Sequence, residues 1–360
     1  MKRVIRFLVI SAFLFMLFFV CASADEGEDV LEDFSSIIPD NVDINVGDVG
    51  SALGVDALLG EIVAALSDRA GDAAGFFLLL LGFAVVISLA SHSSLANDAA
   101  LDSTVQVAVS SVAAASIFAA LYDVCLALEN GLVSVVDFLA SAIPIFTLVS
   151  TSSGAVSTAS TQAFNMNLTL ALIEKFCTGA LLPIAFAIFS LGFTSSISDG
   201  SVGNVAKGVK SAFMWGVGIV GSLLSAIIAM QSVVASATDN ATLRAARYAA
   251  SGMIPIVGSS VASALSTLGG GMAYLKSTVG MGSVAVILAL SIAPLVSLLL
   301  YRLSISACLT FLEFSGSVGG VRCYSAFRAA LDTLIAVYST SVLVCIIEVV
   351  VFVKGGITAA

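Results

Sequence analysis

The sequence predicts an all-α membrane protein whose helices cross the bilayer several times. Hydrophobic residues make up 59% of the 360-residue chain and charged residues only 11%, whereas a soluble domain carries about 25% charged residues. Several apolar runs also reach the roughly 20 residues that a helix needs to cross the hydrocarbon core. Together these observations predict a polytopic transmembrane helical bundle, with about seven spans after an N-terminal signal.

Residues 1–24 have the pattern of a secretory signal peptide. Basic residues precede an apolar core, and Ala22-Ser23-Ala24 has the small-x-small form of a cleavage site. An uncleaved first membrane anchor is the alternative. Both interpretations put the residues that follow outside the cytoplasm.

Residues 25–72 form an acidic extracytoplasmic segment. They hold 13 of the 24 acidic residues, and Arg69 is the only basic residue among them. Acidic residues hinder translocation little, whereas lysine and arginine resist it, so the segment fits the outer side. Within it, residues 55–66 carry apolar side chains at helical spacing, which predicts a short amphipathic helix on the outer surface or on a partner. The net charge of −10 belongs to this segment, and no basic patch with interleaved aromatic residues indicates nucleic acid.

The transmembrane helical domain is expected to cover residues 73–360. Residues 150–167 are rich in serine, threonine, alanine and glycine, which predicts a flexible linker or irregular backbone that lines a polar path. The expected spans are residues 73–90, 104–126, 132–149, 168–193, 211–234, 279–300 and 329–353.

Residues 251–274 are apolar, but Pro255 and several glycines interrupt them. Interrupted backbone is tolerated at membrane depth only where protein or a water-filled cavity covers it. We therefore expect the Pro/Gly-broken element around Pro255 and Gly258 to pack at the bundle centre or at a subunit interface.

The path of this element decides the orientation of the rest of the chain. If residues 251–274 cross the membrane, Lys276 and the C-terminus lie outside. If the element is re-entrant, the arginines between residues 302 and 328 lie outside instead, against the positive-inside rule. The proline and glycine content favours the re-entrant form.

The sequence carries no enzyme motif. His92 is the only histidine, which excludes a two-histidine metal site. There is no Gly-x-Ser-x-Gly elbow, and residues 203–208 resemble a phosphate loop but are followed by Val209 where a lysine is needed. We therefore expect no catalytic residue, no cofactor and no metal, and hence a protein that is not an enzyme.

Ionisable residues inside the expected spans are the candidates for function. Asp137 lies in the third span, and Glu174 and Lys175 lie near the start of the fourth. A charged side chain at the bilayer centre costs about 2.5–3.5 kcal/mol on insertion scales, so such residues usually face protein or water. They are expected to line a polar path or to mediate contacts between subunits, and placement at the membrane interface is the alternative.

One region resembles a known family. The motif Arg-Tyr-Ala-Ala-Ser-Gly-Met-Ile-Pro-Ile-Val-Gly at residues 247–258, then Lys276-Ser277-Thr278-Val279-Gly280, Pro294 and Tyr301-Arg302-Leu303, resemble stage III sporulation protein AE of endospore-forming bacteria. The order of signal, acidic segment, spans and broken element is also similar. The sequence departs from the pattern at Leu312-Glu313-Phe314, where a proline is expected.

The resemblance implies a non-enzymatic membrane protein of the mother cell, in the outer forespore membrane during sporulation. Its partners would be membrane lipids and the other stage III sporulation membrane proteins of a secretion-like channel complex, with a homo-oligomer as a further form. That complex would join the mother cell to the forespore and support late forespore gene expression. The rival hypothesis is a stand-alone secondary permease that uses intramembrane carboxylates, but no inverted repeat supports it.

Overall fold

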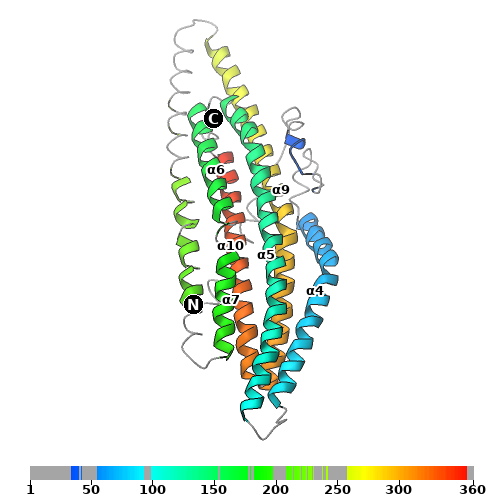
Figure 1. The fold of residues 1–360 in the computed structure, drawn as a ribbon. Coiled ribbons are helices and arrows are strands. Elements are labelled where there is room, and N and C mark those ends of the chain that lie inside the picture. The colour runs from blue at the N-terminus through cyan, green and yellow to red at the C-terminus, as the bar shows by residue number, and fades with distance from the viewer. Residues whose placement is uncertain are drawn as a thin grey trace.

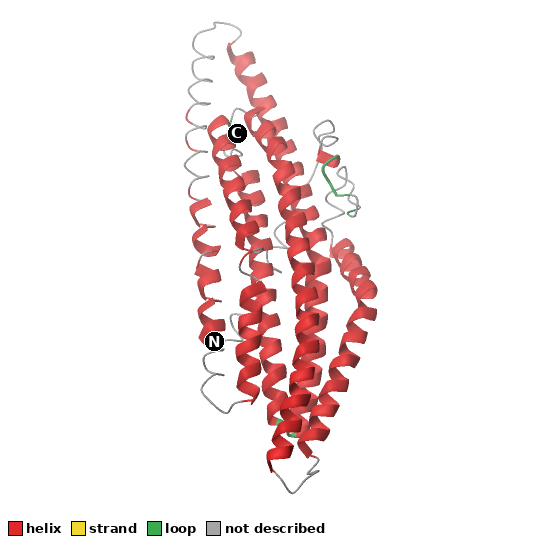
Figure 2. Cartoon of the chain, in the orientation of Figure 1, coloured by secondary structure: helices red, strands yellow, loops and turns green. Residues whose placement is uncertain are grey.

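The described chain is an elongated bundle of long helices (Figures 1 and 2). No strand occurs among the described residues, and five helices are long and apolar enough to cross a membrane. The all-α fold class is therefore confirmed. The computed structural model describes residues 34–39, 42, 55–92, 99–152, 155–176, 179, 182–197, 208–213, 215–219, 221–224, 226–228, 230, 237, 241 and 258–354.

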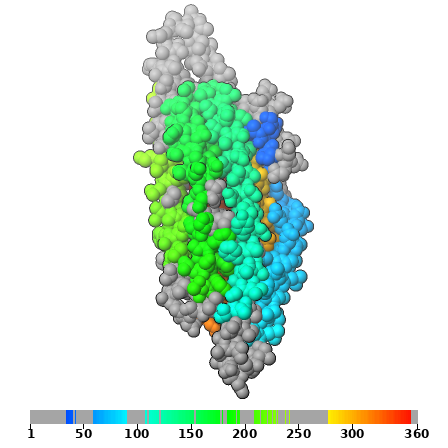
Figure 3. Space-filling view, in the orientation of Figure 1, coloured from blue at the N-terminus to red at the C-terminus, as the bar shows by residue number. Residues whose placement is uncertain are grey.

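The named helices lie nearly parallel to one long axis (Figure 1). A further helix, Gly208–Ile228, runs along the same axis. In the space-filling view, α4, α5, α6 and α7 make up most of the visible face (Figure 3). The helices are α4 (Val55–His92), α5 (Ala99–Ser152), α6 (Val156–Phe176), α7 (Leu182–Ile197), α9 (Gly258–Ser315) and α10 (Val318–Lys354).

α9 and α10 form the central antiparallel pair, joined by a tight turn at Gly316. Gly316 has a φ of 76°, a left-handed conformation that glycine adopts without a steric penalty. The Gly316 N–H donates to the Glu313 carbonyl and the Ser317 N–H to the Leu312 carbonyl, each at 3.3 Å. This is the hydrogen-bond pattern of a Schellman motif, which ends α9.

The bundle has two distinct ends, which we name by their glycines. At the Gly316 end, α4 reaches the α9–α10 turn, since Ile87 lies against Gly320. At the Gly282 end, the C-terminal part of α10 lies beside α9, since Val353 lies against Gly280.

The other helices alternate in direction between these ends. α5 returns to the Gly282 end, where Phe146 stacks on Phe352 with ring centroids 4.3 Å apart. α6 and then α7 run back along α10 from the Gly282 end towards the Gly316 end. α6 lies beside Val351, and α7 lies beside Phe327. The helix Gly208–Ile228 runs in the opposite direction, towards the Gly282 end. Its start lies beside Asp332, which Lys210 contacts, and Gly221 lies further along α10 against Thr340.

The N-terminal segment is anchored at the Gly282 end by Phe34, whose side chain is 0% exposed. Its ring meets the Phe138 ring edge-on, with centroids 6.1 Å apart. It also occupies the space beside Gly282, where an added Cβ would lie 2.8 Å from Phe34 Cε1. Part of the expected acidic extracytoplasmic segment is thus packed into the helical bundle.

α9 lies at the centre of the bundle, and its side chains between Val279 and Leu298 are mostly buried. A helix that is apolar on all sides is expected to be buried in this way. α5 approaches α9 and α10 closely at Gly131, where an added Cβ would lie 2.7 Å from Pro294 Cγ and 3.2 Å from Tyr338 Oη.

Several predicted elements differ from the structure. The expected spans 104–126 and 132–149 are parts of one 54-residue helix, α5. The glycine and polar residues between them do not end the helix, since Glu129 and Asn130 lie on its more accessible side and Gly131 fits against Pro294. The expected span 168–193 is divided between α6 and α7.

The expectation that glycines interrupt residues 251–274 is wrong for the part that the structure describes. α9 is helical from Gly258 to Ser315 and includes the three glycines at 269–271. Pro255 lies outside the described residues. Gly280 packs on Val353, near the end of α10. The part of α9 from Gly258 to Gly280 is about 33 Å long at 1.5 Å per residue. We call this part of α9 the overhang.

The long helices exceed the thickness of a bilayer. α5 has 54 residues and α9 has 58, which gives lengths of about 81 and 87 Å at 1.5 Å per residue. The hydrocarbon core is about 30 Å thick. Either helix, if it crosses a bilayer, must therefore extend beyond the hydrocarbon core.

Candidate functional site

Two groups of polar side chains lie inside the otherwise apolar bundle. We call Lys210, Arg302 and Asp332 the central ion cluster. We call the buried polar stripe of α6, together with Glu348 of α10, the α6–α10 polar seam; its residues are Thr158, Gln162, Asn165, Thr169 and Glu348.

The central ion cluster joins three helices through one carboxylate. Arg302 Nε donates to Asp332 Oδ1 at 2.7 Å, and Lys210 Nζ lies 3.5 Å from Asp332 Oδ2. The exposed fractions of the Lys210, Arg302 and Asp332 side chains are 24%, 28% and 14%. Removing one partner of a poorly solvated ion pair is costly, so the cluster fixes how α9, α10 and the helix Gly208–Ile228 lie together.

Further polar residues lie on the neighbouring helices close to Arg302. The Tyr301 hydroxyl is within electrostatic range of Arg69 and Asp72 of α4 and of Asp123 of α5. The Tyr301 ring meets the Phe76 ring edge-on, with centroids 4.6 Å apart. Charged and polar groups from α4, α5, α9 and α10 therefore occur at one level of the bundle, between two apolar sections.

The polar seam arises from a stripe along α6. Thr158, Gln162, Asn165 and Thr169 are separated by four, three and four residues, which places them on one face of a helix. All four are buried. The expectation of a flexible linker or irregular backbone at residues 150–167 is therefore wrong from Val156 onward, because this stretch is the first half of a helix with a buried polar face.

The seam is held by two long-range hydrogen bonds. Thr169 Oγ1 donates to Glu348 Oε1 at 2.5 Å, and Gln162 Nε2 donates to the Val351 carbonyl at 3.1 Å. The Glu348 residue is only 4% exposed. Polar side chains in an apolar bundle hold neighbouring helices together in this way, so the seam attaches α6 to α10.

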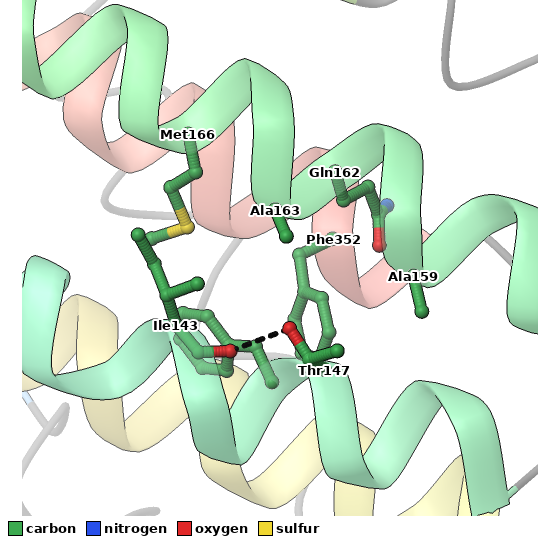
Figure 4. Close-up of a pocket in the computed structure, with 8 residues that line it drawn as sticks. Ile143, Thr147, Ala159, Gln162, Ala163, Met166 and Phe352 are labelled. Carbon is green, nitrogen blue, oxygen red and sulfur yellow. Dashed lines mark hydrogen bonds between the residues drawn. The ribbon is translucent and has the colours of Figure 1, made fainter.

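A small cavity lies beside the seam, between α5, α6 and α10 (Figure 4). Ile143, Met166 and Phe352 form its apolar side, and Gln162 and Thr147 line its polar side. The Thr147 hydroxyl donates to the Ile143 carbonyl at 2.8 Å. The free volume is about 10 Å³, close to the lower limit for one water molecule. The cavity is too small for an organic substrate.

The predicted candidate residues lie elsewhere. Asp137 on α5 and Glu174 and Lys175 on α6 are exposed, so the structure places them on the outer surface of the chain, away from the seam. The Asp137 carboxylate makes no hydrogen bond or ion pair with the described residues. Their contact with another subunit stays a prediction.

The remaining candidates fall in and before the overhang. Gly258 is the first residue of α9, and the backbone of Lys276 lies within the same helix. Pro255 lies outside the described residues. A role for these three residues at the bundle centre or at a subunit interface stays a prediction.

Sequence reasoning missed the residues that the structure brings together. Asp332 falls in the expected span 329–353, Thr169 in the expected span 168–193 and Gln162 in the stretch 150–167, and the sequence marks none of them as a site residue. The spacing of the polar residues on α6 was a signal that could have identified the seam. Among the described residues, no group of three or more His, Cys, Asp or Glu side chains is arranged to hold a metal ion.

Comparison with known proteins gives a consistent result. Residues 35–356 match the family model described as Stage III sporulation protein AE. The chain is also similar to the Stage III sporulation protein AE of Bacillus subtilis (strain 168), with 24% identity over 295 residues that cover 79% of this chain and 71% of the relative. No solved structure matches the chain significantly.

Proposed function

Because the chain belongs to the stage III sporulation protein AE family, we propose that it is a non-enzymatic component of a transmembrane channel complex used in sporulation. In this proposal it lies in the outer forespore membrane with the other stage III sporulation membrane proteins. The complex joins the mother cell to the forespore and supports forespore development. The family match over residues 35–356 is the observation that carries the proposal.

The structure supports an assembled role over a stand-alone permease. The cavity beside the seam has room for about one water molecule. Asp137 and Glu174, the carboxylates that would couple transport in a permease, are exposed on the outside of the bundle. Large apolar side chains are also exposed on several helices, including Phe164 on α6 and Phe314 on α9. These surfaces suit lipid or other membrane proteins.

Photocrosslinking in sporulating cells tests the proposal. A photoreactive phenylalanine analogue at Phe164 or Phe314, which are 66% and 95% exposed, should join the protein to other stage III sporulation membrane proteins in a large membrane complex. The analogue at the buried Phe189 of α7 is the matched control and should give no intermolecular product. Recovery of uncrosslinked monomer from both exposed positions would contradict the proposal.

We further propose an orientation for the bundle. Phe34 anchors the N-terminal segment at the Gly282 end, and we expect that acidic segment on the outer side. The Gly282 end would then face outward together with the C-terminus, and the Gly316 end would face the cytoplasm. Arg302, Arg322 and Arg328 lie towards the Gly316 end of α9 and α10, in agreement with the positive-inside rule.

Cysteine labelling should verify this orientation. In intact vegetative cells made to produce the protein in the cell membrane, a membrane-impermeant maleimide should label Ser35→Cys, whereas Glu313→Cys, near the Gly316 turn, should react only after permeabilisation. Both positions are exposed. Cys125, Cys308, Cys323 and Cys345 are buried, so only the two cysteines outside the described residues need replacement by alanine. The opposite labelling pattern would overturn the orientation.

A further inference from the structure

Glu348 is a buried carboxyl group within an apolar helix. It lies in the candidate span Val318–Val353 of α10 and is 4% exposed. Between Asp332 and Lys354, it is the only ionisable side chain of α10 apart from Tyr338 and Cys345. A carboxylate in such surroundings is expensive, and buried intramembrane carboxyl groups commonly belong to ion or proton sites.

The charge of Glu348 has no countercharge among the described residues. Its hydrogen-bond partner is the neutral Thr169 hydroxyl, and the ion pairs of the described chain involve other residues. On the helices packed against this region, Asp137 of α5 and Glu174 and Lys175 of α6 are exposed.

The charged residues of the central ion cluster lie far from Glu348 along the bundle. Asp332 is 16 residues away on α10, about 24 Å along the helix, and Arg302 of α9 is bound to it. The side chains of Lys276 and Lys354 lie outside the part of the chain whose side chains the structure describes. One hydroxyl donor cannot compensate a buried negative charge, so the described side chains leave the charge of an ionised Glu348 to be balanced by a bound cation.

The neighbouring side chains supply oxygen ligands. Thr169 hydrogen-bonds to Glu348, and Asn165 and Gln162 continue the same buried stripe of α6 towards the Val351 carbonyl. Carboxylate, hydroxyl and carbonyl oxygens hold protons and Na⁺ in helical membrane proteins.

We propose that the α6–α10 polar seam is a binding site for an exchangeable monovalent cation, a proton or Na⁺, held on the Glu348 carboxylate and bordered by Thr169. The bound cation neutralises the carboxylate and allows α6 to stay packed on α10. This site is independent of the proposed sporulation role, because it rests on Glu348 and its neighbours alone.

Carbodiimide labelling of the purified full-length protein tests the site. Dicyclohexylcarbodiimide is apolar and reacts with protonated carboxyl groups: a carbodiimide nitrogen takes the carboxyl proton, the carboxylate oxygen adds to the central carbon, and the adduct rearranges to a stable N-acylurea. We expect modification of Glu348, located by fragmenting the peptide that follows Arg328. Glu348→Gln should lose this modification, whereas Glu174→Gln, which changes an exposed carboxyl group on α6, should retain it.

Two arms of the experiment distinguish the cations. If Na⁺ occupies the seam, adding NaCl in place of choline chloride at constant pH should suppress labelling of Glu348, and Thr169→Val should weaken this protection. If a proton occupies it, labelling should fall as the pH rises and should not respond to Na⁺. Helical circular dichroism verifies that the protein is folded. If folded protein in Na⁺-free buffer shows no labelling of Glu348 at any pH, the proposal is overturned. Labelling that responds to neither pH nor Na⁺ would do the same, because it would show a permanently neutral group.

Discussion

We expect Asp332→Ala to destabilise the bundle more than the removal of any other single charged side chain. The substitution leaves Arg302, which donates to Asp332 at 2.7 Å, and Lys210, at 3.5 Å, without their common carboxylate. Breaking a buried ion pair from one side costs about 3–5 kcal/mol. Because the three side chains keep some access to their surroundings, the lower part of that range is expected. Thermal unfolding of the purified protein in detergent measures the effect.

The control removes the cations together with the carboxylate. Lys210→Met and Arg302→Met added to Asp332→Ala should recover most of the lost stability, because no unpaired charge then remains between the helices. Asp332→Asn should give an intermediate loss, since the amide oxygen can still accept from Arg302. An Asp332→Ala protein that unfolds at the wild-type temperature would show that the cluster does not hold the helices together.

Gly131→Val will separate α5 from the central helix pair. Even the first added atom, Cβ, would lie 2.7 Å from Pro294 Cγ and 3.2 Å from Tyr338 Oη. Overpacking of a core costs about 1–3 kcal/mol, and the Pro294 ring cannot rotate out of the way. Valine adds two further methyl groups, so we expect the upper part of the range or failure to accumulate in the membrane. Protein level and thermal unfolding are the measurements.

Gly82→Ala is the matched control for this prediction. Gly82 lies within α4, and an added Cβ there meets nothing within 4 Å. Alanine is the better helix former by roughly 0.5–1 kcal/mol, so Gly82→Ala should be neutral or slightly stabilising. Gly131→Ala combined with Pro294→Ala should be more stable than Gly131→Ala alone. Equal stability of Gly131→Val and wild type would mean that α5 does not approach α9 as closely as the structure shows.

Hydrophobicity was sufficient to predict the fold class, because composition and run length depend only on the sequence. It did not predict where the long helices end. In α5, the Glu129-Asn130-Gly131 stretch has the pattern of a connection, since its two polar residues are unfavourable in a bilayer. The helix continues because the polar pair is on the accessible side and Gly131 permits contact with Pro294. That contact joins residues 163 positions apart and has no local signal.

The lack of a local signal for long-range contacts also explains why the sequence did not predict the residues of the candidate site. A search for charged residues within apolar runs selected Asp137, Glu174 and Lys175, but it could not distinguish exposed positions from buried ones. Glu348 falls within the expected span 329–353, yet its neighbour Thr169 lies 179 positions earlier. Pairing between distant helices decides which polar groups are buried, and one sequence without its packing does not contain that information.

The unbroken course of α9 has a mechanical consequence. One helix connects the overhang, the Phe34 anchor beside Gly282 and the ion pair of Arg302. Pro294 lies between the Phe34 anchor and Arg302 and has no backbone N–H to donate to the preceding turn of the helix, so bending of α9 between these two contacts is expected at this residue.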